Sequence, residues 1–220
     1  EGPIQKEKSS FIISGRRTYA DMLARLSPDF KDLKLFFYDL NAKANVAINA
    51  KNKIYFSGYF GKDVFDVSNT FGSKWGNVTG TLRWNSIISR KLFSNTSFIY
   101  SNYDFNVGFR SDGNETNFNS NIKDLNLKQD FTFYANAKNT VRFGFNAIHH
   151  TITPTIAGGT GIVSTKKSRK GLENALYVSN TVKASDKLCL DYGLRFSFYN
   201  VMGGDTYNIY KGDELVDSVK

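Results

Sequence analysis

The two histidines, His149 and His150, are the residues whose chemistry could most readily build a metal or acid–base site. They are adjacent in a stretch that alternates apolar and polar residues, which predicts a β-strand. Successive side chains of a strand point to opposite faces, so the two imidazoles cannot bind one ion together. We therefore predict that the pair lies near a strand end without a metal, where a histidine close to a loop mouth could touch a ligand.

Two polar stretches suggest other sites but lack the spacing that those sites need. Residues 157–168, AGGTGIVSTKKS, do not match the glycine-to-Gly-Lys-Ser/Thr spacing of a phosphate loop. Residues 110–121 contain Asp112 and Glu115 without the alternating acids and distal glutamate of a calcium loop. The single cysteine, Cys189, excludes an internal disulfide and cannot hold a metal alone. Because no nucleophile lies with a base, the sequence predicts a protein that is not an enzyme and has no cofactor or metal.

The net charge of +9 raises the question of an anionic partner. No helix-turn-helix, zinc-finger or RNA-binding motif accompanies the charge, so we expect no nucleic acid. One cluster concentrates it: Lys166, Lys167, Arg169 and Lys170. We expect this cluster in an exposed loop, where lipopolysaccharide phosphates or an anionic substrate are candidate partners and solubility is the alternative explanation.

The remaining charges follow a period of two, which assigns them to one face of long strands. In residues 187–200, leucines and aromatic residues share one parity while Asp191 and Arg195 share the other. Residues 36–49 repeat this arrangement, as do 77–85, 124–136 and 141–147. Of the adjacent Arg16 and Arg17, at most one can lie on the polar face, and the other is expected to extend along an interface.

About nine such strands can be counted, in residues 9–19, 36–49, 53–60, 77–85, 93–109, 124–136, 141–147, 175–184 and 187–200. Short turns near Lys51, Arg90, Lys138 and Ser185 alternate with longer segments at 20–34, 61–74, 110–123, 151–171 and from 202 onward. Tilted strands of about 9–11 residues can cross a bilayer, and short turns alternating with long loops are typical of outer-membrane barrels. We predict an all-β antiparallel meander that is part of a transmembrane β-barrel, with short periplasmic turns and long extracellular loops.

This prediction divides the strand residues into two sets. The candidates for the lumen are Asp39, Lys43, Arg83, Asp130, Arg142, Asp191 and Arg195. The candidates for contact with lipid are Leu40, Val46, Trp84, Phe143, Leu194 and Phe196. A soluble barrel or sandwich with an apolar ligand inside is the alternative, and it would turn the aromatic face inward.

Two stretches, GPIQKEKSSFIISGRRTY at 2–19 and DKLCLDYGLR at 186–195, resemble TonB-dependent outer-membrane receptors of Gram-negative bacteria. Residues 2–19, from Gly-Pro-Ile to Ser-Phe-Ile-Ile-Ser-Gly-Arg-Arg-Thr-Tyr, resemble an early barrel region, and residues 186–195 resemble the recurrent Asp-Lys-Leu-x-Leu-x-x-Gly-Leu-Arg strand. The resemblance implies a barrel of about 22 strands around a plug domain. It also implies partners: outer-membrane lipid, the plug, an energy-transducing inner-membrane complex, and a bulky nutrient such as an iron chelate, a cobalamin or an oligosaccharide.

We therefore expect residues 1–220 to form a single barrel segment without a plug domain, in the outer membrane of a Gram-negative bacterium. The alternative in that membrane is a small structural or adhesive barrel of eight to ten strands. Because an isolated segment has unpaired edges and a wet aromatic face, we expect it to need detergent, dimerisation or closure into a smaller barrel.

Overall fold

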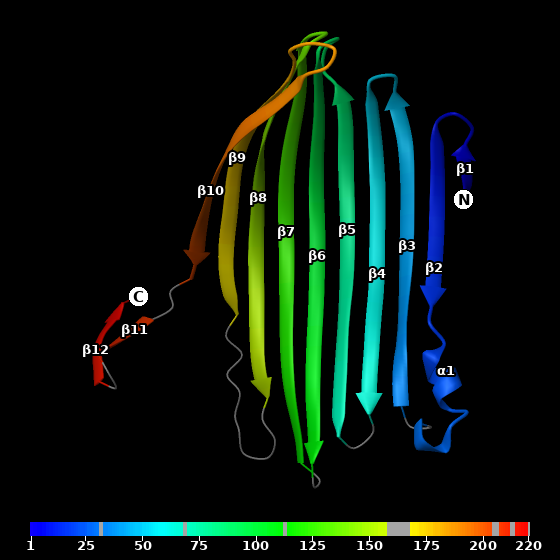
Figure 1. The fold of residues 1–220 in the computed structure, drawn as a ribbon, viewed down its shortest axis with the longest axis vertical. Coiled ribbons are helices and arrows are strands. Elements are labelled where there is room, and N and C mark those ends of the chain that lie inside the picture. The colour runs from blue at the N-terminus through cyan, green and yellow to red at the C-terminus, as the bar shows by residue number, and fades with distance from the viewer. Residues whose placement is uncertain are drawn as a thin grey trace.

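The protein folds into one long antiparallel sheet whose ten strands follow the chain order (Figure 1). The computed structural model describes residues 1–30, 33–67, 70–111, 114–157, 168–203, 207–211 and 214–219. The strands of the sheet are β1 (Gly2–Gln5), β2 (Ser9–Arg17), β3 (Leu33–Asn49), β4 (Asn52–Val67), β5 (Phe71–Ile87), β6 (Leu92–Ser111), β7 (Asn114–Asn136), β8 (Asn139–Ala157), β9 (Arg169–Lys183) and β10 (Cys189–Met202). The predicted antiparallel meander is confirmed.

The sheet contains one strand more than the sequence predicted, because β1 is four residues long and was not counted. The segment from Met202 onward, expected as a long connection, contains a separate hairpin of β11 (Tyr207–Lys211) and β12 (Glu214–Val219). None of the helices among the described residues is long and apolar enough to cross a membrane.

Tight turns join β3 to β4, β5 to β6, β7 to β8 and β9 to β10 at the same end of the sheet, which we call the turn end (Figure 1). Side chains stabilise these turns in a repeating way. The Asn49 carboxamide oxygen accepts a hydrogen bond from the Lys51 amide at 2.9 Å, and Asn136 does the same for Lys138 at 2.9 Å. A short side-chain acceptor that bonds the backbone two residues on favours a turn. The predicted short turns are confirmed.

The predicted long loops at the other end, the open end, are wrong in two places. Residues 61–74 belong mostly to β4 and β5, and residues 110–123 mostly to β6 and β7. The segment 20–34 instead holds α1 (Ala20–Ala24) and the short helix η1 (Pro28–Phe30). The strands were missed because their apolar residues change parity there, as described below, and a one-parity pattern ends at that point.

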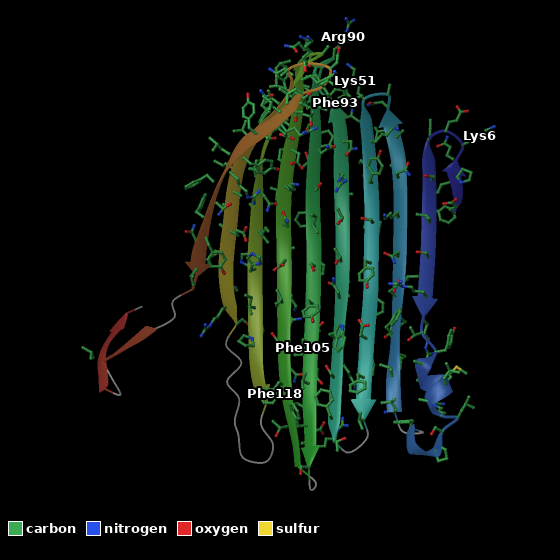
Figure 2. The ribbon with its side chains drawn as sticks, viewed as in Figure 1. Lys6, Lys51, Arg90, Phe93, Phe105 and Phe118 are labelled. Carbon is green, nitrogen blue, oxygen red and sulfur yellow. The ribbon has the colours of Figure 1, made fainter. Side chains whose placement is uncertain are left out.

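The sheet has almost no core of its own. Among the described residues, the only apolar side chains that are buried are Val64 and Ala175, whereas Leu194 is 80 % exposed and Phe196 66 % exposed. Figure 2 shows side chains along the whole length of the strands. Exposed apolar surface of this extent marks contact with another partner. Within the part of the chain that the structure describes, β1 and β10 each have one neighbour in the sheet, so both edges are free there.

Candidate functional site: the two faces of the sheet

The strand register defines two faces that we name by adjacent residues of β10. Leu194 is opposite Val178 on β9, which is opposite Phe143 on β8, and the side containing these residues is the Leu194 face. Arg195 is opposite Tyr177, and the side containing these two residues is the Arg195 face. Because the register is continuous from β4 to β7, every residue of those strands belongs to one face by its parity.

The two predicted sets of residues fall on different faces. By register, Leu40, Val46, Trp84, Phe143, Leu194 and Phe196 all lie on the Leu194 face. Asp39, Lys43, Arg83, Asp130, Arg142, Asp191 and Arg195 all lie on the Arg195 face. What each face contacts stays a prediction.

Arg16 and Arg17 separate as their adjacency predicted. Arg16 lies on the Arg195 face, where its Nε donates to Asp39 at 2.5 Å. Arg17 lies on the other face, 3.1 Å from Asp21 and with its guanidinium 5.1 Å from the centre of the Phe36 ring. Each charge therefore has a local partner that suits its side of the sheet.

A belt without charged residues, mostly apolar but with Thr96 and Gln129 among its members, covers the Leu194 face from the turn end to the middle of the strands. On β7 it runs from Phe133 to Leu125, nine residues, and the next residue on this face is Lys123. The charged residues of this face in β3–β10 all lie beyond the belt, toward the open end: Lys34, Lys62, Asp66, Lys74, Asp104, Arg110, Glu115, Lys123 and Lys170. The belt has the length that a tilted membrane-crossing strand needs, about 9–11 residues.

Past the belt the two faces exchange character. On the Arg195 face, charges and amides give way to aromatic rings toward the open end, where Figure 2 labels Phe105 and Phe118. Phe65, Phe71, Phe109 and Phe118, on four successive strands, form a row with ring centroids 5.9, 5.3 and 6.2 Å apart. Such pairs have the tilted or edge-on geometry that aromatic rings favour. The belt therefore covers only part of each strand.

Directly behind the belt, on the opposite side of the sheet, the Arg195 face carries a network of polar and ring contacts that connects three strands. The Tyr177 hydroxyl on β9 donates to Asp130 on β7, and Lys128 lies 3.4 Å from the same carboxylate. The Arg195 guanidinium stands 5.5 Å from the centre of the Tyr177 ring. Tyr177 was not among the predicted residues. The signal for it was Gly144, opposite Tyr177 on β8, which leaves space that an aromatic ring can cover.

His150 lies between two carboxylates near the middle of that face. Its Nδ1 is 2.8 Å from an Asp124 carboxylate oxygen and its Nε2 is 3.6 Å from Glu173, and the side chain is 19 % exposed. His149 lies on the Leu194 face, opposite Leu125, so the two imidazoles diverge as predicted. Within the described residues no group of three His, Cys, Asp or Glu side chains is placed to hold a metal ion.

Two of the four predicted loop cations lie in a strand instead. Arg169 and Lys170 open β9, where they are opposite Ile152 and Thr151, so their expected place in a loop is wrong. Lys166 and Lys167 lie outside the described residues. Pairing with β8 continues farther than the sequence suggested because β8 itself extends past the belt.

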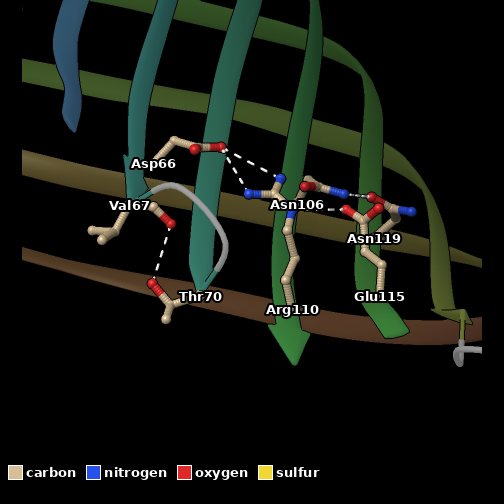
Figure 3. Close-up of polar contacts among 7 residues, drawn as sticks. All are labelled: Asp66, Val67, Thr70, Asn106, Arg110, Glu115 and Asn119. Carbon is tan, nitrogen blue, oxygen red and sulfur yellow. Dashed lines mark hydrogen bonds and ion pairs between the residues drawn. The ribbon is translucent and has the colours of Figure 1, made fainter. Parts of the chain in front are cut away.

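On the Leu194 face at the open end, Arg110 joins two carboxylates (Figure 3). Its guanidinium is 3.5 Å from Asp66 and 3.4 Å from Glu115, and Asp66 is only 5 % exposed. Hydrogen bonding to the Asp66 carboxylate raises the pKa of the Arg110 guanidinium above its usual value. Beside this group the Asn106 amide donates to Asn119 across β6 and β7.

Comparison with known proteins adds little at the level of sequence. No family model and no curated protein matches the chain. Among solved structures, the chain is similar to the translocator domain of autotransporter NalP from Neisseria meningitidis, with 10 % identity, 90 % of this chain and 68 % of that chain covered, and a TM-score of 0.47. A likeness at this level does not bear on function.

Proposed function

We propose that this chain is wall of a transmembrane β-barrel in the outer membrane of a Gram-negative bacterium, with its Leu194 face against lipid. The observation that carries the proposal is the belt: every charged residue of that face in β3–β10 lies on one side of it. A charged side chain facing hydrocarbon is costly, whereas the same residue at or beyond the interface is not. A strand also satisfies its backbone groups only through neighbours, as this sheet does between its edges.

The Arg195 face supports a water-filled or plugged interior beside the belt. It carries both signs of charge at neighbouring positions, such as Lys128 and Asp130, and polar pairs such as Arg83 Nε with Ser97 Oγ at 3.2 Å. These groups would be unsatisfied against hydrocarbon, whereas water or polar groups of a plug can bond them. The chain acts as a scaffold and passage wall in this proposal, not as an enzyme.

Within this class, the finer proposal is a receptor that imports a bulky nutrient. The resemblance of residues 186–195 to a recurrent receptor strand supports it, together with the mixed charges that a plug could bond. The rest of the wall and the plug would then belong to other parts of the parent protein, through which an energy-transducing inner-membrane complex would act. The second candidate is a small structural or adhesive barrel, which the ten-strand sheet favours because such barrels have eight to ten strands.

Spin-label accessibility at two adjacent positions tests the facing of the sheet. Leu194→Cys and Arg195→Cys are labelled separately in a Cys189→Ser background, with the protein in lipid. We expect the label at 194 to be relaxed by oxygen dissolved in the bilayer and the label at 195 by an aqueous nickel reagent. A label at 194 shielded from both reagents would make the belt a protein core and end the membrane proposal.

A second measurement separates the receptor from the small barrel. A small barrel formed by this chain alone joins β1 to β10 and migrates as a compact species in detergent gels until it is boiled. A receptor wall lacks the strands that would cover these edges, so it migrates as an extended species before and after boiling. As a control, circular dichroism in the same detergent shows whether the protein has its β-sheet structure before it is boiled.

A further inference from the structure

A groove of about 500 Å³ lies on the Leu194 face where the belt ends. The residues that line it include Phe60, Lys62, Lys74, Gly76, Val78 and Asp104. It is hollow because Gly76 has no side chain between Lys62 on β4 and Asp104 on β6. A Cβ at Gly76 would stand 3.2 Å from the Gly61 carbonyl oxygen, closer than ordinary contact. The groove therefore joins apolar and cationic surfaces at one level of the sheet.

The two lysines of the groove can act on one anion. Lys62 is opposite Gly76, and Lys74 is two residues further along β5, so the two are diagonal neighbours on adjacent strands. Diagonal positions are about 7–8 Å apart, within reach of two long side chains that converge on one group. Among the described residues, neither lysine side chain has an ion pair or a hydrogen bond.

The carboxylates nearby are already engaged. Asp66 is held by Arg110. Asp104 accepts from Asn102 at 3.0 Å and from Asn121, so amides bond its charge. On this face of β3–β10, three carboxylates, Asp66, Asp104 and Glu115, stand against six cations, Lys34, Lys62, Lys74, Arg110, Lys123 and Lys170. The margin of the belt is therefore basic, and its two groove lysines are unpaired.

The apolar side of the groove continues into the belt. Phe60 and Val78 are opposite each other, and the next pair toward the turn end is Gly58 and Gly80. These two glycines leave a low track that runs across β4 and β5, between the Phe60–Val78 pair and the Phe56–Leu82 pair. Phe56 and Leu82 are both about half exposed. A hydrocarbon chain can lie along such a track while a charged group attached to it reaches the lysines.

We propose that this groove binds a phosphate-bearing lipid of the surrounding membrane, with the phosphate between Lys62 and Lys74 and an acyl chain on the Gly58–Gly80 track. The inference rests on the proposed membrane-facing role of the Leu194 face. The site requires both chemistries at once: an anion at the level of the lysines and an apolar chain below it. A soluble phosphate would use only the first.

Native mass spectrometry of the protein in dodecyl maltoside with bis-phosphorylated lipid A tests the site. We expect the double variant Lys62→Gln/Lys74→Gln to bind the lipid about tenfold or more weakly, since each lysine near an anionic lipid contributes about one factor of five to ten. The matched control is Lys123→Gln/Lys170→Gln, which removes the same charge from the same face outside the groove and should change binding by about twofold or less.

Three outcomes would overturn the proposal: equal weakening by both double variants, equal binding of dephosphorylated lipid A, or displacement of the lipid by millimolar inorganic phosphate. Gly76→Val, which fills the groove without removing charge, should also weaken binding. The labels at 194 and 195 distinguish the two levels of failure. If position 194 meets lipid while the groove variants bind normally, the groove assignment alone is wrong.

Discussion

Tyr177 connects three strands through one side chain. Its ring lies over Gly144 on β8, and its hydroxyl donates to Asp130 on β7. A Cβ at Gly144 would stand 2.1 Å from the Gln129 carbonyl oxygen, so no larger residue fits without moving the backbone. The glycine, the tyrosine and the aspartate are thus one unit of the Arg195 face.

We expect Tyr177→Phe to lower the free energy of unfolding by about 1.5 kcal/mol or more, because the Asp130 carboxylate loses a donor. Tyr199→Phe is the matched control, since Tyr199 similarly lies over Gly171 without a hydrogen bond from its hydroxyl among the described residues. Urea unfolding in lipid vesicles measures both. Equal losses in the two variants would show that ring packing, not the hydrogen bond, carries the effect.

At the open end, Asp66 makes a second residue-scale prediction. Arg110→Gln leaves this 5 % exposed carboxylate without its cation, so we expect a clear loss in the free energy of unfolding. Glu115→Gln removes the more exposed partner and should cost much less. The order of the two variants in urea unfolding is the readout, and the reverse order would contradict the central place of Asp66.

At the scale of the strand, the exchange of faces past the belt determines which strand segments could be predicted from the sequence. Where one parity stayed apolar, as in 36–49 and 187–200, the period-two pattern correctly predicted the strand and its two faces. In 61–74 and 110–123 the strand continues but its apolar residues move to the other parity, from Leu125 to Ile122 and Phe118 on β7. A search for one apolar face ends there, so the extensions were taken for loops.

Contacts across strands were beyond the sequence for a different reason. The pairing of Arg110 with Asp66 joins residues 44 apart, and that of Tyr177 with Asp130 joins residues 47 apart. Each depends on a strand register that no local pattern specifies. The basic cluster at 166–170 can be recognised in the sequence because its members are consecutive or nearly so. Lys62 and Lys74 are 12 residues apart and become neighbours only because β4 and β5 are adjacent.

The exchange of faces predicts two different environments on one side of β7. We expect a spin label at Leu127→Cys to respond to oxygen in the bilayer and a label at Asn121→Cys to respond to aqueous nickel, although both lie on the Leu194 face. The physical reason is the different depth of the two residues along the membrane normal, since residue 127 lies within the belt and residue 121 lies beyond it. Lipid exposure at both positions would mean that the belt margin is not the membrane surface.

For the whole molecule, the absence of a core among the described residues sets the conditions for stability. Folding normally removes apolar surface from water, but this sheet keeps its belt exposed and leaves two free edges. In the proposed membrane orientation, the belt is covered by lipid or detergent, and each edge pairs either with another strand or with the opposite edge of the same sheet. Neither need can be met by the two buried apolar residues that the sheet has.

Analytical ultracentrifugation tests this requirement. We expect a discrete particle with bound detergent above the critical micelle concentration, and association into larger species when the detergent is diluted. Density matching with heavy water separates the mass of protein from that of detergent. A monodisperse particle without detergent would show that the belt is covered by protein.

In the proposed membrane orientation, the belt also fixes where the sheet can sit along the membrane normal. A shift by one pleat, about 7 Å along a strand, toward the turn end would carry Lys62 and Lys123 into hydrocarbon, and a shift the other way would lift belt residues into water. Each misplaced lysine costs from a few tenths to about 4 kcal/mol, depending on its depth. Because the strands are hydrogen-bonded into one sheet, all of these costs act together. The position of the sheet along the membrane normal is thus a thermodynamic property of its amino-acid sequence.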